Sequence, residues 1–159
     1  MQVSQVKLRQ TNIADLEFFF LFQLDEEANY LAAFTPKDHT NKEAYVQKFA
    51  RFLLDPTINM QTILVDEAIA GSMAKFEQEG AAEMTYWLDR RFWGQGIATA
   101  ALNLFLLTEA ARPVFGRVAF DNVGSQRVLE KCGFVRIGTD KGFANARQAE
   151  IAEFIYKLP

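Results

Sequence analysis

The sequence predicts a mixed α/β fold in a single domain spanning residues 1–159. Half of the residues are apolar and 23% are charged, which is the balance of a globular chain of one-domain size. Short segments that alternate apolar and polar residues indicate strands, and longer apolar segments with capping residues indicate helices. Near the middle, a strand, a helix and another strand follow one another, so we expect both kinds of element to share one sheet-based core.

The chain should begin with a strand followed by a long helix. Val3–Arg9 alternates well enough to form this strand. Thr11-Asn12 can cap a helix that we expect to run from Ile13 to Ala33. Because the run Phe18–Phe22 is apolar on more than one face, this helix should be heavily buried.

A second helix and three strands should follow a loop at Phe34–His39. Thr40 with Glu43 has the spacing of a capping box, and the helix that it starts should end near Leu54. The period then changes to that of strands. Breaks short enough for hairpins separate three runs, which should form an antiparallel meander: Gln61–Val65, Ile69–Glu77 and Ala82–Leu88.

The last third of the chain predicts two helices and three strands. Gly133 stands where a helix C-terminus favours left-handed backbone. We expect a loop over Asp89–Gly96 and a connection over Asp140–Arg147. The helices are expected at Ile97–Ala111 and Val123–Cys132, and the strands at Val114–Phe120, Phe134–Thr139 and Ala149–Lys157.

Composition excludes several classes of protein. The formal charge is −3 and basic residues form no face, so we expect no nucleic acid as partner. Cys132 and His39 are the only residues of their types, which excludes an intrachain disulfide and metal sites built from several cysteines or histidines; we expect no metal. No apolar run is long enough to cross a membrane and the start does not resemble a signal peptide, so we expect a cytoplasmic protein without a membrane partner.

The most informative segment is a glycine-rich loop between a strand and a helix, Arg91-x-x-Gly94-x-Gly96. Free backbone N–H groups at a helix N-terminus form an anion site, and glycine leaves them open to phosphate. One alternative is a turn in which glycine only relieves strain. Another is a dinucleotide-binding unit with Asp121 as its ribose acid, but Thr99 occupies the third glycine position and the chain is short for that fold.

Two motifs identify a family resemblance. The loop resembles the Q/R-x-x-G-x-G/A motif of the GCN5-related N-acetyltransferases (GNAT), and Asn122–Phe134 resembles the N-x-x-S-x-R-V-L-E-K-x-G-F segment of their RimJ/RimL-like branch. Tyr86-Trp87-Leu88 and the order of elements are similar to that branch too. The resemblance implies a GNAT fold, with a twisted mixed sheet of about seven strands flanked by about four helices, in the order β-α-α-β-β-β-α-β-α-β-β.

The resemblance also implies acetyl-CoA as cosubstrate. In such enzymes it lies where the fourth and fifth strands part, so backbone groups of Trp87 and Leu88 would bond the pantetheine arm, with Asn122 beside it. Lys131 would reach the phosphates, or be a solvated helix charge. The pyrophosphate would lie on the N–H groups of the loop and the first helical turn, with Arg91 nearby: Phe92, Trp93, Gly94, Gln95, Gly96, Ile97, Ala98 and Thr99.

The implied reaction is direct attack of a primary amine on the thioester. Glu83 is placed like a carboxylate base acting through water, or is a solvent-facing strand residue. Ser125 resembles a proton donor to the thiolate, or is a cap residue. Leu129 occupies the position where many relatives carry an acid tyrosine, which argues against a tyrosine acid there.

The acceptor implied by the resemblance is a protein N-terminus or a small-molecule amine, and the protein would be a monomer or a homodimer. An alternative from another class is a CoA-binding sensor that transfers no acyl group. Leu129 and the uncertain role of Glu83 keep this alternative open.

Overall fold

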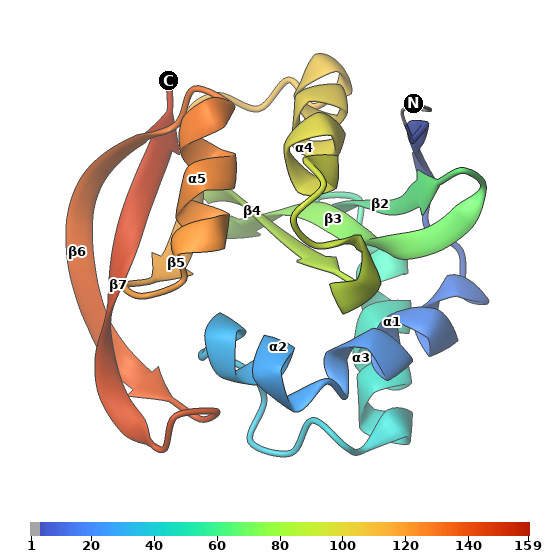
Figure 1. Ribbon diagram of the computed structural model, residues 1–159, viewed down its shortest axis with the longest axis horizontal. Coiled ribbons are helices and arrows are strands. Elements are labelled where there is room, and N and C mark those ends of the chain that lie inside the picture. Colours follow the sequence, from blue (N-terminus) through green and yellow to red (C-terminus); the bar gives the residue numbers. More distant parts are fainter. Residues whose placement is uncertain (1–3) are drawn as a thin grey trace.

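The protein, described by a computed structural model over residues 4–159, is built on a seven-stranded sheet in the order β1-β2-β3-β4-β5-β7-β6 (Figure 1). The strands are β1 (Val6–Gln10), β2 (Asn59–Val65), β3 (Ala68–Gln78), β4 (Ala81–Leu88), β5 (Val114–Ala119), β6 (Val135–Ala144) and β7 (Ala149–Leu158). The helices are α1 (Asp15–Gln23), α2 (Glu26–Ala32), α3 (Lys42–Leu54), α4 (Ile97–Thr108) and α5 (Val123–Lys131), with a short 3₁₀ turn at Arg90–Phe92.

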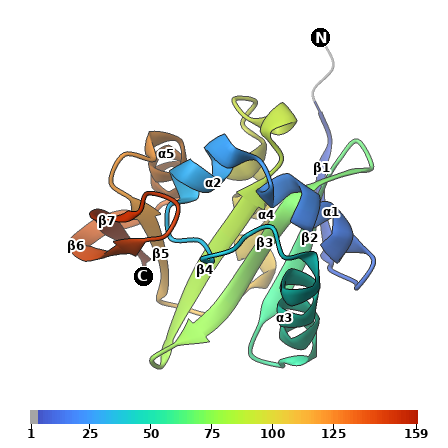
Figure 2. The ribbon, with the colours of Figure 1, turned by 90° about the horizontal axis from the view of Figure 1, so that it is seen from below.

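Helices cover both faces of the sheet (Figures 1 and 2). The larger core lies between the sheet and α4 with α5, where Met73, Leu102 and Phe105 are fully buried. The smaller core joins Leu16 and Phe19 of α1 to α3 and the opposite face. Burial of these apolar side chains from water is the main stabilising contribution to the fold. None of the helices within residues 4–159 is both long enough and apolar enough to cross a membrane.

β4 and β5 are paired over only a short length. Their parallel ladder contains Ala82 opposite Val114 and Glu83 opposite Phe115, and beyond Glu83 no further pairs join them. On its other edge β4 stays in register with β3 along its whole length, from Ala81 to Leu88, without a bulge. The end of β4 is therefore held by β3 and separated from β5, as the family resemblance implied.

The meander of β2, β3 and β4 and the crossover through α4 are confirmed, but the single helix expected from Ile13 to Ala33 is wrong. The chain breaks at Asp25, whose backbone is extended and whose carboxylate accepts hydrogen bonds from the N–H groups of Glu27 and Ala28, at 3.1 and 3.3 Å. A carboxylate in this position starts a new helix, because it satisfies N–H groups that have no partner in the first turn. Residues 4–159 therefore contain five α-helices, and the order of elements is β-α-α-α-β-β-β-α-β-α-β-β.

Several boundaries also differ from expectation. Asn41, not Thr40, caps α3 through a 3.0 Å bond from the Ala44 N–H, because the Thr40 hydroxyl already donates to Asp38. α4 ends at Thr108, and β6 continues to Ala144, well beyond the expected Thr139. β6 is an edge strand, and most of its side chains are exposed. Its side chains do not alternate between buried and exposed, so the sequence lacks the pattern that would have predicted its full length. The residues Met1–Val3 lie outside the described residues, and the first strand begins at Val6.

Candidate functional site

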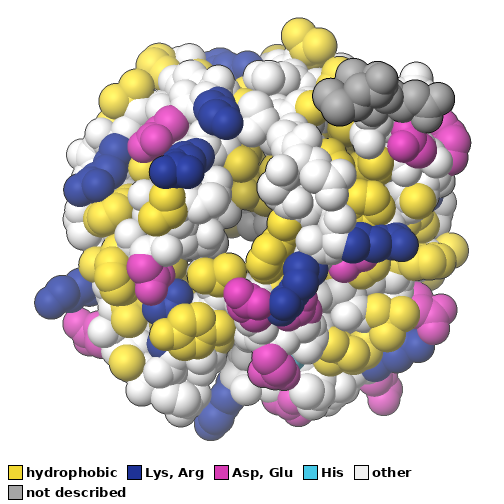
Figure 3. Space-filling view, viewed as in Figure 1, with side chains coloured by type: hydrophobic (Ala, Val, Ile, Leu, Met, Phe, Trp, Pro, Cys, Tyr) yellow, Lys and Arg dark blue, Asp and Glu magenta, His cyan; other side chains and the backbone are white. Residues whose placement is uncertain are grey.

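The parted strands open into a cleft of about 630 Å³. Four segments line it: the end of β4, the glycine loop with the first turn of α4, the Asp121–Asn122 turn with α5, and α2. The surface is hollowed at this position near the middle of the face shown in Figure 3. Of the residues expected at the site, twelve line the cleft: Trp87, Leu88, Phe92, Trp93, Gly94, Gly96, Ile97, Ala98, Thr99, Asn122, Ser125 and Lys131.

The glycine loop has the backbone that only glycine adopts without strain. Gly94 and Gly96 have φ of 72° and 76°, in the left-handed region. A Cβ at either would meet no atom within 4 Å, so the space in front of the loop is open. Gly96 is the N-cap of α4 and has no side chain, so the first N–H groups of the helix are left for a ligand. This arrangement suits an anion such as a phosphate.

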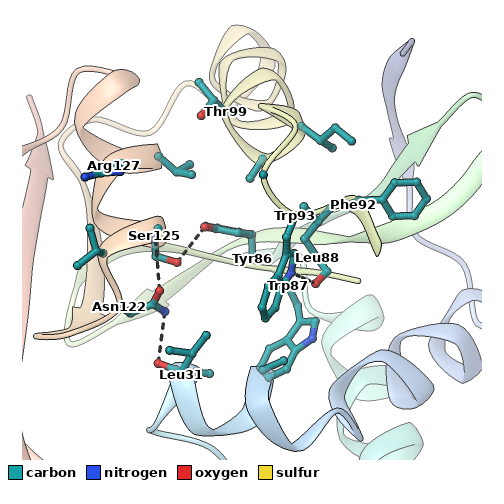
Figure 4. Close-up of a pocket in the computed structure, with 18 of the residues that line it drawn as sticks. Leu31, Tyr86, Trp87, Leu88, Phe92, Trp93, Thr99, Asn122, Ser125 and Arg127 are labelled. Carbon is teal, nitrogen blue, oxygen red and sulfur yellow. Dashed lines mark hydrogen bonds between the residues drawn. The ribbon is translucent and has the colours of Figure 1, made fainter. Parts of the chain in front are cut away.

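The loop is fastened to the end of β4. The Trp93 indole N–H donates to the Leu88 carbonyl at 2.8 Å, and the Gln95 amide donates to the Arg91 carbonyl at 2.9 Å. One of the backbone groups expected to be free for pantetheine, the Leu88 carbonyl, is therefore occupied. Trp87 remains beside the opening, and its ring points toward α2 in Figure 4.

Two residues expected at the phosphates do not line the cleft. Arg91 is exposed, pairs with Asp89 at 2.9 Å and lies over the Phe92 ring. Gln95 is also exposed, and its amide is turned back to the Arg91 carbonyl. Lys131, at the end of α5, does line the cleft and has the charge that phosphate oxygens require.

Asn122 links α5 to α2. Its side-chain oxygen accepts the Ser125 N–H at 3.4 Å and caps α5, and its amide donates to the Leu31 carbonyl at 3.3 Å (Figure 4). The cap role that Ser125 was considered for thus belongs to Asn122. The Ser125 hydroxyl instead lies 2.8 Å from the hydroxyl of Tyr86.

Tyr86 is the polar residue of β4 in the cleft that sequence reasoning missed; residues of α2 and α5 were missed as well, namely Ala28, Leu31, Ala32, Val123, Gly124, Arg127 and Val128. Tyr86 shares with Met84 and Leu88 the face of β4 that packs toward α4 and α5. Figure 4 shows its side chain pointing to Ser125. Leu129 is buried and packs on Gly116, so α5 supplies only apolar atoms at that position. The sequence does contain a signal for Tyr86: side chains two positions apart in a strand lie on the same face, so Tyr86 and Leu88 both face α4 and α5.

Glu83 lies outside the cleft, at the last point where β4 and β5 are paired. Its side chain is buried, and its carboxylate lies 3.6 Å from the Arg117 guanidinium, which also binds Glu153 at 2.9 Å and Asp140 at 3.3 Å. Burial raises the pKa of Glu83, and the positive charge of Arg117 partly opposes this rise. Glu83 and Trp87 are four positions apart on the same face of β4, about 13 Å along the strand.

α2 bridges the two walls of the cleft. At its start Arg90, from the loop after β4, pairs with Asp25 and with Glu27. At its end Arg147 donates to the Tyr30 carbonyl at 2.6 Å and stacks on the Tyr30 ring. The same guanidinium holds both oxygens of Asp121, at 2.8 and 3.0 Å. Asp121 is thus engaged within the protein, which argues against a role as the ribose acid of a dinucleotide site.

A sheet that parts beside a glycine-rich helix N-terminus defines the class of protein: one that holds a phosphate-bearing carrier with its extended arm between two strands. The chain matches the family described as acetyltransferase (GNAT) domain over residues 5–135. It belongs to this family, the GNAT N-acetyltransferases.

Solved structures of similar fold span nearly the whole chain. RimL, an alpha-N-protein acetyltransferase of a ribosomal protein in complex with coenzyme A, has a TM-score of 0.85 and 21% identity, covering 96% of this chain and 93% of that one. The microcin self-immunity acetyltransferase MccE, in complex with acetyl-CoA and AMP, has a TM-score of 0.81 and 19% identity, with 97% and 92% covered. RimJ from Mycobacterium smegmatis has a TM-score of 0.79 and 20% identity, with 96% and 81% covered. No curated protein sequence matches this chain.

Proposed function

We propose that this acetyltransferase acts on the α-amine of a protein or peptide, and that the reaction takes place in the cleft between β4 and β5. The observation that carries the proposal is the separation of these strands beyond Glu83, directly beside the open N-terminus of α4. The fold shared with RimL and RimJ supports a polypeptide acceptor. MccE shares the fold as well, so small-molecule amines belong in the same test.

The residues that line the cleft fit acetyl-CoA as the acyl donor. The loop at Gly94 and Gly96 and the first N–H groups of α4 would bind the pyrophosphate, with Lys131 nearby. Backbone groups of β4 near Trp87 would hold the amide-rich arm like an added strand, and Asn122 would border it. Arg91 and Gln95 would act only from the outer side of the loop.

The reaction requires a neutral amine, a hydrogen-bond donor that stabilises the oxyanion, and a thiolate that is stabilised as it leaves. An ammonium group has no lone pair, so one proton must leave before attack. Because Glu83 lies outside the cleft, it would accept the proton through a chain of water molecules, and its raised pKa makes it a stronger base than an exposed carboxylate. A backbone N–H at the end of β4 would stabilise the oxyanion, and Ser125 would donate a hydrogen bond to the thiolate.

The proposal is tested by incubating the protein with acetyl-CoA and a panel of amines, with release of free thiol as the readout. The panel contains peptides with free N-termini, the same peptides with blocked N-termini, and small amines. We expect thiol release with the free peptides and an acetylated N-terminus by mass spectrometry. Thiol release with small amines alone would contradict the polypeptide acceptor.

The alternative of a CoA-binding sensor is favoured by two observations: Leu129 is a core residue, and Glu83 is tied to Arg117 outside the cleft. It predicts tight binding of acetyl-CoA without thiol release for any amine of the panel. The same experiment therefore separates the two functions.

A further inference from the structure

Tyr86 and Ser125 form a hydrogen-bonded pair across the opening of the sheet. Tyr86 belongs to β4 and Ser125 to the first turn of α5, the elements that the parted strands separate, and their hydroxyl oxygens are 2.8 Å apart (Figure 4). Both side chains line the cleft. The pair thus places two hydroxyl groups where the thioester arm would pass.

The surroundings fix both partners. The Ser125 backbone N–H donates to the side-chain oxygen of Asn122, which fixes the position from which the Ser125 side chain extends. Tyr86 packs against the larger core and extends along the cleft wall. Both residues are half-buried and belong to a strand and a helix, elements that can hold a hydrogen bond in a precise orientation.

The direction of the hydrogen bond follows from acidity. A phenol is a stronger acid than an aliphatic alcohol and is the better donor, so Tyr86 donates and the Ser125 oxygen accepts. The single hydrogen of Ser125 is then left for another acceptor in the cleft. Burial raises the pKa of Tyr86, so Tyr86 keeps its proton at neutral pH.

We propose that Tyr86 is a positioning residue for acetyl transfer: by donating to the Ser125 oxygen it turns the Ser125 hydroxyl toward the CoA sulfur. This inference rests on the proposed function. When the C–S bond breaks, the electron pair leaves with sulfur and the Ser125 hydrogen bond stabilises the thiolate. Ser125 and Tyr86 keep their protons. The thiolate takes, through water, one of the two protons that the amine nitrogen loses.

The test is a double-mutant cycle with Tyr86→Phe and Ser125→Ala, measured as kcat and KM for acetyl-CoA. Tyr86→Phe keeps the ring and removes only the hydroxyl. We expect each single variant to lower kcat by roughly 10- to 100-fold, the worth of a hydrogen bond to a charged group, with KM for acetyl-CoA nearly unchanged. The double variant should be no slower than the Ser125→Ala variant, because Tyr86 acts through Ser125.

Tyr156→Phe is the matched control. Tyr156 also donates from a strand to α5, to Glu130 at 2.9 Å, but it lies in the core and not in the cleft. It should change the melting temperature and leave kcat as in the wild type. A merely structural role of Tyr86 would give the same pattern as this control.

Three outcomes overturn the inference. Unchanged kcat in either single variant shows that the pair does not act, and losses that multiply in the double variant show that Tyr86 acts independently of Ser125. If the wild-type protein transfers acetyl to no amine, the proposed function fails and this inference with it. If the wild type transfers acetyl groups and the Tyr86→Phe variant is equally fast, the inference fails while the proposed function stands.

Discussion

The phosphate-binding role of the loop depends on single residues, and Gly96 is the most demanding of them. Its φ of 76° lies in the region where a side chain is strained, although a Cβ would meet no protein atom. The open space in front of it is the proposed phosphate position. A substitution at Gly96 should therefore affect the ligand more than the packing of the protein.

We predict that Gly96→Ala weakens acetyl-CoA binding tenfold or more, about 1.4 kcal/mol, because the added methyl group restricts access to the N–H groups of α4. Titration calorimetry with acetyl-CoA measures this change. Gly80→Ala is the matched control, since Gly80 also has a positive φ and open surroundings, but lies in the turn between β3 and β4. Equal affinity of the Gly96 variant and the wild type would refute the phosphate role.

Glu83 gives a second prediction at this scale. Glu83→Gln should lower turnover at least tenfold while the affinity for acetyl-CoA stays close to that of the wild type. Because burial raises the pKa of Glu83, activity of the wild type should fall on acidification at a higher pH than for an exposed glutamate. A pH profile of kcat/KM measures both effects. Glu153→Gln, which removes another partner of Arg117, controls for disturbance of that cluster.

The same pKa shift has an effect on stability with a defined sign. A carboxyl group with a raised pKa in the folded state stabilises the fold at acidic pH, and this contribution is lost as the pH rises through the raised value. Glu83→Gln stays neutral, so its free energy of unfolding, relative to the wild type, should increase between acidic and neutral pH. A profile in the opposite direction would mean that the Arg117 interaction outweighs burial.

At the scale of elements, α2 is the part of the site that the sequence hid. The apolar run Phe18–Phe22 predicts one long helix, and it is the Asp25 cap, a tertiary partner of Arg90, that starts a second. β6 was predicted too short because an edge strand carries polar residues on both faces. The glycine loop and the caps near Asn122 act locally, and for that reason their sequence signals were sufficient.

Removing the anchor at the C-terminal end of α2 tests its role as a bridge. Arg147→Met should destabilise the protein by about 1–3 kcal/mol, because it leaves Asp121 and the Tyr30 carbonyl without their charged partner. Amide hydrogen exchange over α2 should become faster, and KM for the acceptor should change more than KM for acetyl-CoA. Denaturant unfolding and exchange measured by mass spectrometry report the two effects.

Arg90→Met supplies the comparison at the N-terminal end of α2. Arg90 is more exposed than Arg147, with 48% of its side-chain surface accessible against 6%, so its removal should destabilise the protein less than removal of Arg147. If both variants leave exchange over α2 unchanged, packing alone holds this helix and the bridge has no role.

On the scale of the whole molecule, the sheet is two groups of strands joined at a short seam. β1 to β4 form one group and β5 to β7 the other, and Ala82–Val114 and Glu83–Phe115 are the paired positions between them. The length of this seam depends on strand register, which no local sequence signal reports. α2, α4 and α5 complete the connection around the cleft.

A ligand that fills the opening should therefore stabilise the molecule as a whole. Acetyl-CoA at a hundred times its Kd adds about 2.7 kcal/mol, which raises the melting temperature of a chain of this size by about 5–10 °C. NAD and NADP at the same concentration should leave it unchanged. Hydrogen exchange should slow at the start of α4, in α5 and in α2, the elements that line the cleft. Stabilisation by NADP but not by acetyl-CoA would show that the protein binds a different ligand. Protection from hydrogen exchange spread evenly over the sheet would show that acetyl-CoA does not bind between β4 and β5.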